Sequence, residues 1–158
     1  MVKAGQTGAV KHTTTIVVEQ PLDLVAESLA DLGSYPHWND VVAAAEPLES
    51  ASPEPSWHTT LRARVGPFAR SKVLRMARTR NEQTELGHVI RFERSELDGR
   101  DHAAWIMDAA LEAVDDGTEV SLTLHYDGGL WTGALDGVLG AAIDRATRRL
   151  PDYLASYR

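Results

Sequence analysis

The chain has 158 residues, of which 43% are hydrophobic and 25% are charged, and its formal net charge is −7. This size and composition predict one globular domain with a full hydrophobic core. The negative charge argues against a general role in binding nucleic acid or anionic membranes, because both need a positive protein surface. Ten of the 16 basic residues lie between Arg62 and Arg100, so a locally basic face remains open, although a solvated outer face of strands is the simpler interpretation.

The absence of cysteine excludes disulfides, thiolate nucleophiles and cysteine metal sites. The first residues lack the apolar run of a secretory signal, and no run of about 18 apolar residues predicts a membrane span. The sequence therefore predicts a cytoplasmic protein.

The chain opens with small polar residues, and we expect residues 1–11 to form a flexible arm ahead of a single domain at 12–158. Threonine and valine dominate the stretch 12–20, and these β-branched residues favour a strand. Pro21 suits the first turn of a helix, and apolar residues at helical spacing predict that this helix continues up to Gly33.

A second short helix is predicted from Ser34, a residue type that caps helices, with Pro36 near its start. This helix is expected to carry Tyr35, Trp38, Val41 and Val42. Two prolines then mark a turn-rich stretch before the long β region.

Alternation with a period of two dominates the middle of the chain. In 57–65, apolar residues alternate with histidine, threonine and arginine, which is typical of a sheet with one buried and one solvated face. Gly-Pro at 66–67 and Asp-Gly at 98–99 and 116–117 predict turns between strands. Further strands are expected at 68–79, 85–96, 102–114 and 120–127. With the first strand, the pattern predicts an antiparallel sheet of about six or seven strands.

The last segment, about 131–157, has apolar residues at three- and four-residue spacing and charged residues on the other face, which predicts one long amphipathic helix. Pro151 is expected to kink or restart it near its end. The fold class is therefore α+β: a curved antiparallel sheet wrapped around a long C-terminal helix, with two short helices after the first strand.

This order of elements resembles the START-like superfamily, also called SRPBCC, over Thr14 to Tyr157. The most telling text is IVVEQPLDLVAESLADLGSYPHWND near the start, and the turn VGPF at 65–68 is similar to bacterial members. The superfamily includes polyketide cyclases, the birch-pollen allergen family, lipid-transfer domains and an accessory subunit of carbon monoxide dehydrogenase. The resemblance implies a helix-grip fold with an apolar cavity between sheet and long helix, and only some members are enzymes.

No catalytic residue, cofactor or metal ligand is predicted. The six histidines lack the spacing of a helix-borne zinc motif, and most fall on polar strand positions or near turns. The chain has no G-x-S-x-G nucleophile elbow and no phosphate-binding P-loop. Four charged strand residues, Arg75, Arg91, Asp108 and Glu112, are expected to point away from the core. Glycines at 133, 137 and 140 indicate either close helix packing or room for a ligand.

Aromatic and apolar residues on several elements are expected to line the cavity. The predicted ligand-binding residues are Tyr35, Trp38, Trp57, Leu61, Leu74, Met76, Phe92, Trp105, Met107, Leu124, Tyr126, Leu135 and Leu139.

Three functions follow from this interpretation. The first is binding of a hydrophobic or amphipathic small molecule such as a lipid or polyketide. The second is catalysis by a polyketide aromatase/cyclase or dehydrase acting on a ligand in that cavity. The third is an assembly or docking partner resembling the carbon monoxide dehydrogenase accessory subunit. The expected partner is a small apolar molecule rather than nucleic acid, and the sequence leaves a homodimer open.

Overall fold

The computed structural model describes residues 9–49, 53–127 and 134–157. In chain order the elements are β1 (Ala9–Val18), α1 (Leu22–Leu29), the 3₁₀ helix η2 (Leu32–His37), β2 (Val42–Leu48), β3 (Ser56–Val65), β4 (Phe68–Gln83), β5 (Gly87–Arg94), β6 (Trp105–Val114), β7 (Gly117–Asp127) and α2 (Ala134–Ser156).

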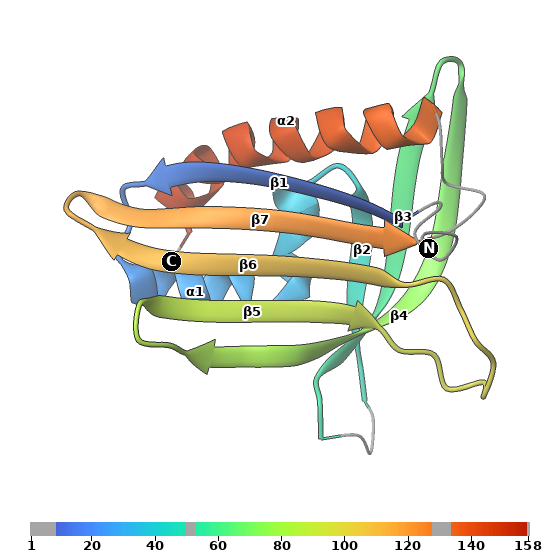
Figure 1. Cartoon of the computed structure of the whole chain (residues 1–158), viewed down its shortest axis with the longest axis horizontal. Helices are drawn as coiled ribbons and strands as arrows, with labels where there is room; N and C mark the ends of the chain where they lie inside the picture. Colours follow the sequence, from blue (N-terminus) through green and yellow to red (C-terminus); the bar gives the residue numbers. More distant parts are fainter. Residues whose placement is uncertain (1–8, 50–52, 128–133, 158) are drawn as a thin grey trace, which may run out of the picture.

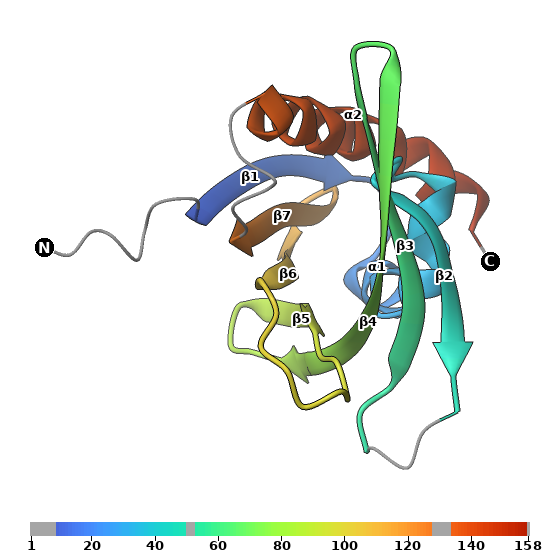
Figure 2. The same ribbon diagram turned by 90° about the vertical axis from the view of Figure 1, so that its right-hand side faces the viewer.

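The strands form one antiparallel sheet in the order β1-β7-β6-β5-β4-β3-β2. The sheet curls, and the helices lie on its concave side, with α2 above β1 and α1 inside the curve (Figures 1 and 2). Helix α2 packs against β1 and β3, whereas α1 packs against β5, β6 and β7. The predicted α+β helix-grip fold is thus confirmed, and α1, like α2, packs on the concave side of the sheet.

Alternating burial along the strands defines the core. On β7, every second side chain from Thr118 to Tyr126 is buried, and β6 has the same pattern from Trp105 to Leu111. Leu29 of α1 and Leu139 and Leu150 of α2 are fully buried against this face. Burying each such side chain contributes roughly 1.5–3 kcal/mol, so the matched apolar faces hold helices and sheet together.

Local predictions differ from the structure in several places, including the ends of some strands. The second short helix ends at His37, and a strand, β2, starts at Val42. Strand β1 starts at Ala9, three residues earlier than expected. The Asp98-Gly99 turn lies within the longer loop 95–104 instead of forming a tight hairpin.

The long helix, α2, runs from Ala134 to Ser156 and is not interrupted at Pro151. Its predicted beginning at Trp131 lies outside the described residues. The side chain of Leu135 also lies outside the described part of the chain, although its backbone belongs to α2.

The β6–β7 hairpin fixes the end of β1. Its two-residue loop, Asp115-Asp116, is followed by Gly117, whose φ is +153°. A Cβ at Gly117 would lie 1.9 Å from the carbonyl oxygen of Val18, so only glycine lets the two backbones approach this closely. Thr118 Oγ1 then donates to the carbonyl oxygen of Gln20 at 2.8 Å, which ties the end of β1 to β7.

Candidate functional site

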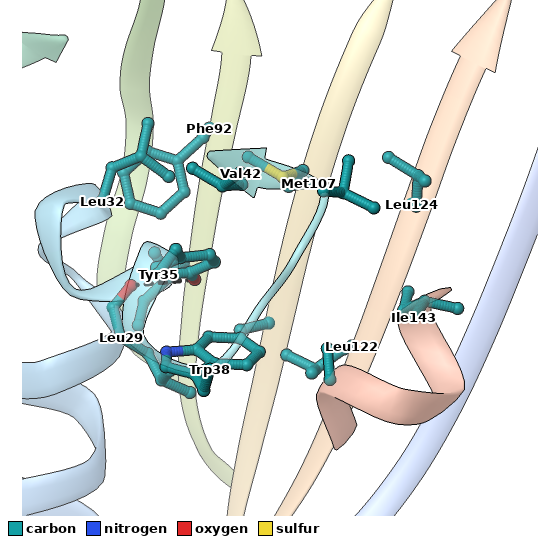
Figure 3. Close-up of a cluster of buried hydrophobic side chains, with 14 of the residues drawn as sticks. Leu29, Leu32, Tyr35, Trp38, Val42, Phe92, Met107, Leu122, Leu124 and Ile143 are labelled. Atoms are coloured by element: carbon teal, nitrogen blue, oxygen red, sulfur yellow. Dashed lines mark hydrogen bonds between the residues drawn. The ribbon is translucent and has the colours of Figure 1, made fainter. Parts of the chain in front are cut away.

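The concave face contains an aromatic cluster built by η2, β3 and β5. The ring of Tyr35 lies 4.7 Å from Trp38 and 5.6 Å from Phe92, and Phe92 lies 5.4 Å from Trp57. Trp38 and Phe92 are fully buried, and Figure 3 shows Tyr35 and Trp38 facing the sheet from η2. This cluster packs into the core, and two of its rings, Tyr35 and Trp38, border the site described below.

The hydroxyl of Tyr35 is part of this packing. It donates to the carbonyl oxygen of Leu29 at 3.0 Å. Burial raises the pKa of Tyr35 far above its ordinary value, and the negative charges of Asp108 and Asp31 add to the effect. The phenol therefore stays protonated over the physiological pH range and serves as a hydrogen-bond donor that fixes η2 against α1.

Two small pockets lie on the concave face. The middle pocket, of about 30 Å³, is lined by Tyr35, Trp38, Asn39, Val41, Met107, Asp108, Leu122, Thr123, Leu124 and Ile143. The end pocket, of about 20 Å³, is lined by Leu61, Lys72, Leu74, Arg94, Ala103, Ala104, Trp105, Tyr126 and Asp127. Each has room for one or two water molecules, whereas a bound small molecule occupies several hundred Å³.

The two pockets are neighbours. Trp105 and Tyr126 of the end pocket are partners across β6 and β7, with their rings 5.5 Å apart. The next inward pair, Met107 and Leu124, belongs to the middle pocket. Figure 3 shows both side chains on the face of the sheet that looks toward η2. Successive rows of side chains on the same two strands therefore line the two pockets.

Eight of the predicted ligand-binding residues line these pockets. They are Tyr35, Trp38, Leu61, Leu74, Trp105, Met107, Leu124 and Tyr126. Trp57, Met76, Phe92 and Leu139 are buried in the surrounding core. The structure adds three apolar residues, Val41, Leu122 and Ile143, to the middle pocket.

Two cations at the end pocket were not predicted from the sequence. Lys72 and Arg94 both line it. Arg94 Nε donates to Glu96 Oε2 at 2.7 Å, and this pair is mostly buried, with side-chain exposures of 10% and 19%. Burial lowers the pKa of Lys72, and the positive charge of Arg94 lowers it further, against a smaller raising effect of Glu96. No carboxylate among the described residues forms an ion pair with Lys72.

Arg75, Arg91, Asp108 and Glu112 have the outward parity of their strands, as predicted, whereas Arg78 donates to the carbonyl oxygen of Ala30 at the end of α1. Arg91 binds Asp108 through two hydrogen bonds, of 2.7 and 2.9 Å. His125 Nε2 lies 3.7 Å from the same carboxylate. The hydrogen bond to Asp108 raises the pKa of Arg91, which keeps the guanidinium charged.

His12 differs from the predicted surface histidines. It shares the inward parity of β1 and is half-buried under α2 at Gly140. His102, by contrast, lies in the loop before β6 and bonds Asp98 at 2.9 Å.

Among residues 9–49, 53–127 and 134–157, no group of three or more acidic or histidine side chains is arranged to hold a metal ion. In the same ranges, no helix is long and apolar enough to cross a membrane.

A larger groove lies outside the core, between the start of β2, β3 and α2. This groove, which we call the helix groove, has a volume of about 460 Å³ and includes Asp40, Arg62, Arg64 and Arg145 among its lining residues. Asp40 pairs with Arg149 of α2 across its edge.

The family model described as polyketide cyclase / dehydrase and lipid transport matches residues 9–156. Human StAR-related lipid transfer protein 5 has a TM-score of 0.74 at 14% identity, covering 90% of this chain and 74% of that protein. TTHA0849 from Thermus thermophilus has a TM-score of 0.69 at 15% identity, covering 93% and 98% of the two chains. The Zhui aromatase/cyclase from Streptomyces sp. R1128 has a TM-score of 0.54 at 19% identity, covering 92% and 90%. At these low identities, the TM-scores show that the chain shares the fold of these proteins. No curated protein sequence matches the chain.

Proposed function

The chain belongs to the polyketide cyclase / dehydrase and lipid transport family, and from this premise we propose that it binds one hydrophobic or amphipathic small molecule, lipid-like or polyketide-like, between the sheet and α2. The observation that carries the proposal is the adjacency of the two pockets on one concave face. Mostly apolar side chains surround both, as expected of a small-molecule site.

Binding requires the two pockets to merge. Met107 stands at the boundary between them, one inward position from Trp105. Methionine has three rotatable bonds and adapts to irregular surroundings, so its side chain can move aside at little cost.

Lys72 and Arg94 support an amphipathic ligand. They give the end pocket a polar rim, whereas Met107, Leu122 and Ile143 give the middle pocket an apolar interior. A ligand lying across both pockets would place its tail among the apolar residues and its polar group beside the cations.

The test is direct identification of a bound molecule. We expect native mass spectrometry of gently purified protein to show a small apolar molecule near one-to-one, or added lipids to bind and raise the melting temperature. Met107→Phe should weaken that binding about tenfold, equivalent to ~1.4 kcal/mol, because a stiff ring keeps the pockets apart. Met107→Leu is the matched control and should bind like the wild type. Absence of binding across lipids and polyketide mimics, or equal binding by all three proteins, would contradict the proposal.

A second candidate function is catalysis by an aromatase/cyclase or dehydrase. Lys72 favours it, because an amine of lowered pKa beside an apolar pocket suits proton transfer with an enol or carbonyl group. Turnover of a synthetic poly-β-ketone, lost in Lys72→Met while binding persists, would support catalysis. Unchanged turnover in that variant would exclude Lys72 from the chemistry.

A further inference from the structure

The β3–β4 hairpin extends beyond the rest of the sheet. The register of β2 with β3 ends at the pair Val42–Leu61, and that of β5 with β4 begins only at Arg94–Met76. Among the described residues, the hairpin between these limits therefore has no further strand beside it. Figure 2 shows it rising past α2 as a two-stranded arm. We call residues 62–73 the basic arm.

The basic arm has an unusual composition for this acidic chain. Its sequence, RARVGPFARSKV, contains four basic residues and no acidic one, whereas the whole chain has a net charge of −7. Arg62, Arg64 and Arg70 are exposed. Phe68, at the turn, is 70% exposed, and Val73 is 50% exposed.

Protection of an open strand edge explains only part of this pattern. Charged residues on edge strands prevent pairing with other chains, and the arginines suit that role. An exposed phenylalanine next to the tip works against it, since aromatic residues favour aggregation when they lie on free strands. Arginines around an exposed aromatic ring instead match the surface of a lipid bilayer, where the ring enters the interface and the cations contact the headgroups.

We propose that the basic arm docks this protein on anionic lipid membranes, with Phe68 inserted at the interface and Arg62, Arg64 and Arg70 on the headgroups. The partner is a bilayer surface and not a soluble acidic protein, because one exposed aromatic side chain at the tip of a narrow hairpin offers too little area for a protein interface.

The length of the arm sets its tip, though not its base beside α2, apart from the acidic body. Four residues separate Leu61 from the turn, or roughly 13 Å at about 3.3 Å per residue in a strand. The screening length at physiological salt is about 8 Å, so a surface at the tip of the arm is largely shielded from the negative charge of the body. The difference in charge between the basic arm and the acidic body also orients the arm toward an anionic surface during approach.

The helix groove lies at the base of the arm. Arg62 and Arg64 form one side of this groove, and Arg145 of α2 lies on the other. Asp40 also lines the groove and pairs with Arg145, so the lining holds three arginines and one carboxylate. A docked arm therefore brings a groove of net positive charge next to the membrane, where a headgroup can enter between β3 and α2.

Vesicle flotation tests the proposal with the full chain. We expect binding to vesicles of phosphatidylcholine and phosphatidylserine in equal parts, weak binding to phosphatidylcholine alone, and loss of binding at high salt. Phe68→Ala should abolish most of the binding. Arg64→Gln with Arg70→Gln should weaken it about 25-fold, since each surface cation contributes about fivefold.

Two control variants match these changes in chemistry but not in place. Leu86→Ala removes an equally exposed apolar side chain at the β4–β5 turn, and Arg148→Gln removes an exposed cation of α2. Both should bind vesicles like the wild type. Failure of the wild type to bind, or equal losses in arm and control variants, would overturn the proposal, as would salt-sensitive capture of acidic proteins without any vesicle binding. Small-molecule binding in solution should be the same in all variants, which separates this proposal from the proposed function.

Discussion

Gly140 of α2 lies directly over the ring of His12 of β1: a Cβ added at Gly140 would be 2.9 Å from His12 Cε1. The helix can approach β1 this closely only because position 140 has no side chain. Gly137, one turn earlier on the same helix, has open space around the corresponding point.

These two glycines should respond differently to substitution by alanine. Gly137→Ala is expected to raise the free energy of unfolding by about 0.5–1 kcal/mol, because alanine favours the helix and meets no neighbour. Gly140→Ala should gain less or lose stability, because the imidazole of His12 must move. Urea denaturation measures both. In a His12→Ala background the two substitutions should become equivalent, and a persistent difference there would contradict the role of His12.

The ion pair at the end pocket should contribute more to stability than an exposed pair of the same kind. Glu96→Gln is expected to lower the free energy of unfolding by about 2 kcal/mol, because it leaves the mostly buried Arg94 without its carboxylate. Glu82→Gln is the matched control, since Glu82 pairs with Arg80 at the same two-residue spacing but with side-chain exposures of 44% and 57%. Its cost should be roughly 0.5 kcal/mol or less. Equal costs in urea denaturation would show that burial does not strengthen the Arg94–Glu96 pair.

Tyr35 should make the fold sensitive to alkaline pH. Its pKa is raised above the ordinary value of 10.0, so the folded state keeps its proton while the unfolded chain loses it. The stabilisation is therefore complete below pH 10 and is lost as the pH rises above that value.

Tyr35→Phe separates this effect from other titrations. The variant should be less stable by about 1 kcal/mol near neutral pH, because the hydrogen bond to Leu29 is lost. Above pH 10 the difference should shrink, since only the wild type has the buried phenol to lose. Denaturation curves at several pH values measure the difference, and a constant gap across pH 10 would refute the assignment.

Lys72 should select ligands by their headgroup, if the proposed function holds. Lys72→Met is expected to weaken binding of a fatty acid about tenfold and to leave the fatty alcohol of the same chain length unchanged, because only the carboxylate interacts with the amine. Lys11→Met removes an exposed lysine of β1 and should alter neither affinity. Calorimetry or a fluorescent fatty-acid analogue measures the affinities. Equal weakening for acid and alcohol would mean that Lys72 matters only for packing.

Fatty-acid binding should also depend on pH. Because the pKa of Lys72 is lowered from 10.5, its charge is lost before that of an ordinary lysine as the pH rises. As the pH rises, the wild type should therefore begin to lose fatty-acid affinity before pH 10.5 is reached. Lys72→Met should show no such decline.

Alternation along the strands predicted most of the fold and much of the site. It placed Leu74, Met107 and Leu124 on the inner face, where the structure has them. The same parity extends from Leu74 to Lys72 and from Phe92 to Arg94, so both cations of the end pocket could have been predicted from it. They were missed because a charged strand residue resembles a solvated position until the loop 95–104 is seen to lie against it.

Other features could not be read from the sequence. Strand β2 has the sequence VAAAEPL, in which alanines give no alternation and Pro47 argues against a central strand. Proline is tolerated there because β2 is at the edge of the sheet. The small volume of the two pockets depends on how α1 and η2 fill the concave side. Tertiary packing of this kind leaves no local pattern in the sequence.

The position of β1 beside β7 has a consequence for the order of folding. Strands β3 to β7 follow one another as neighbours, so each pairs soon after its turn forms, whereas Thr13 meets Thr123 across 110 residues of chain. Closing so long a loop is slow, and α2 needs β1 in place before it can pack. We therefore expect the meander to form first, and β1 and α2 to close over the concave face in the last, rate-limiting step.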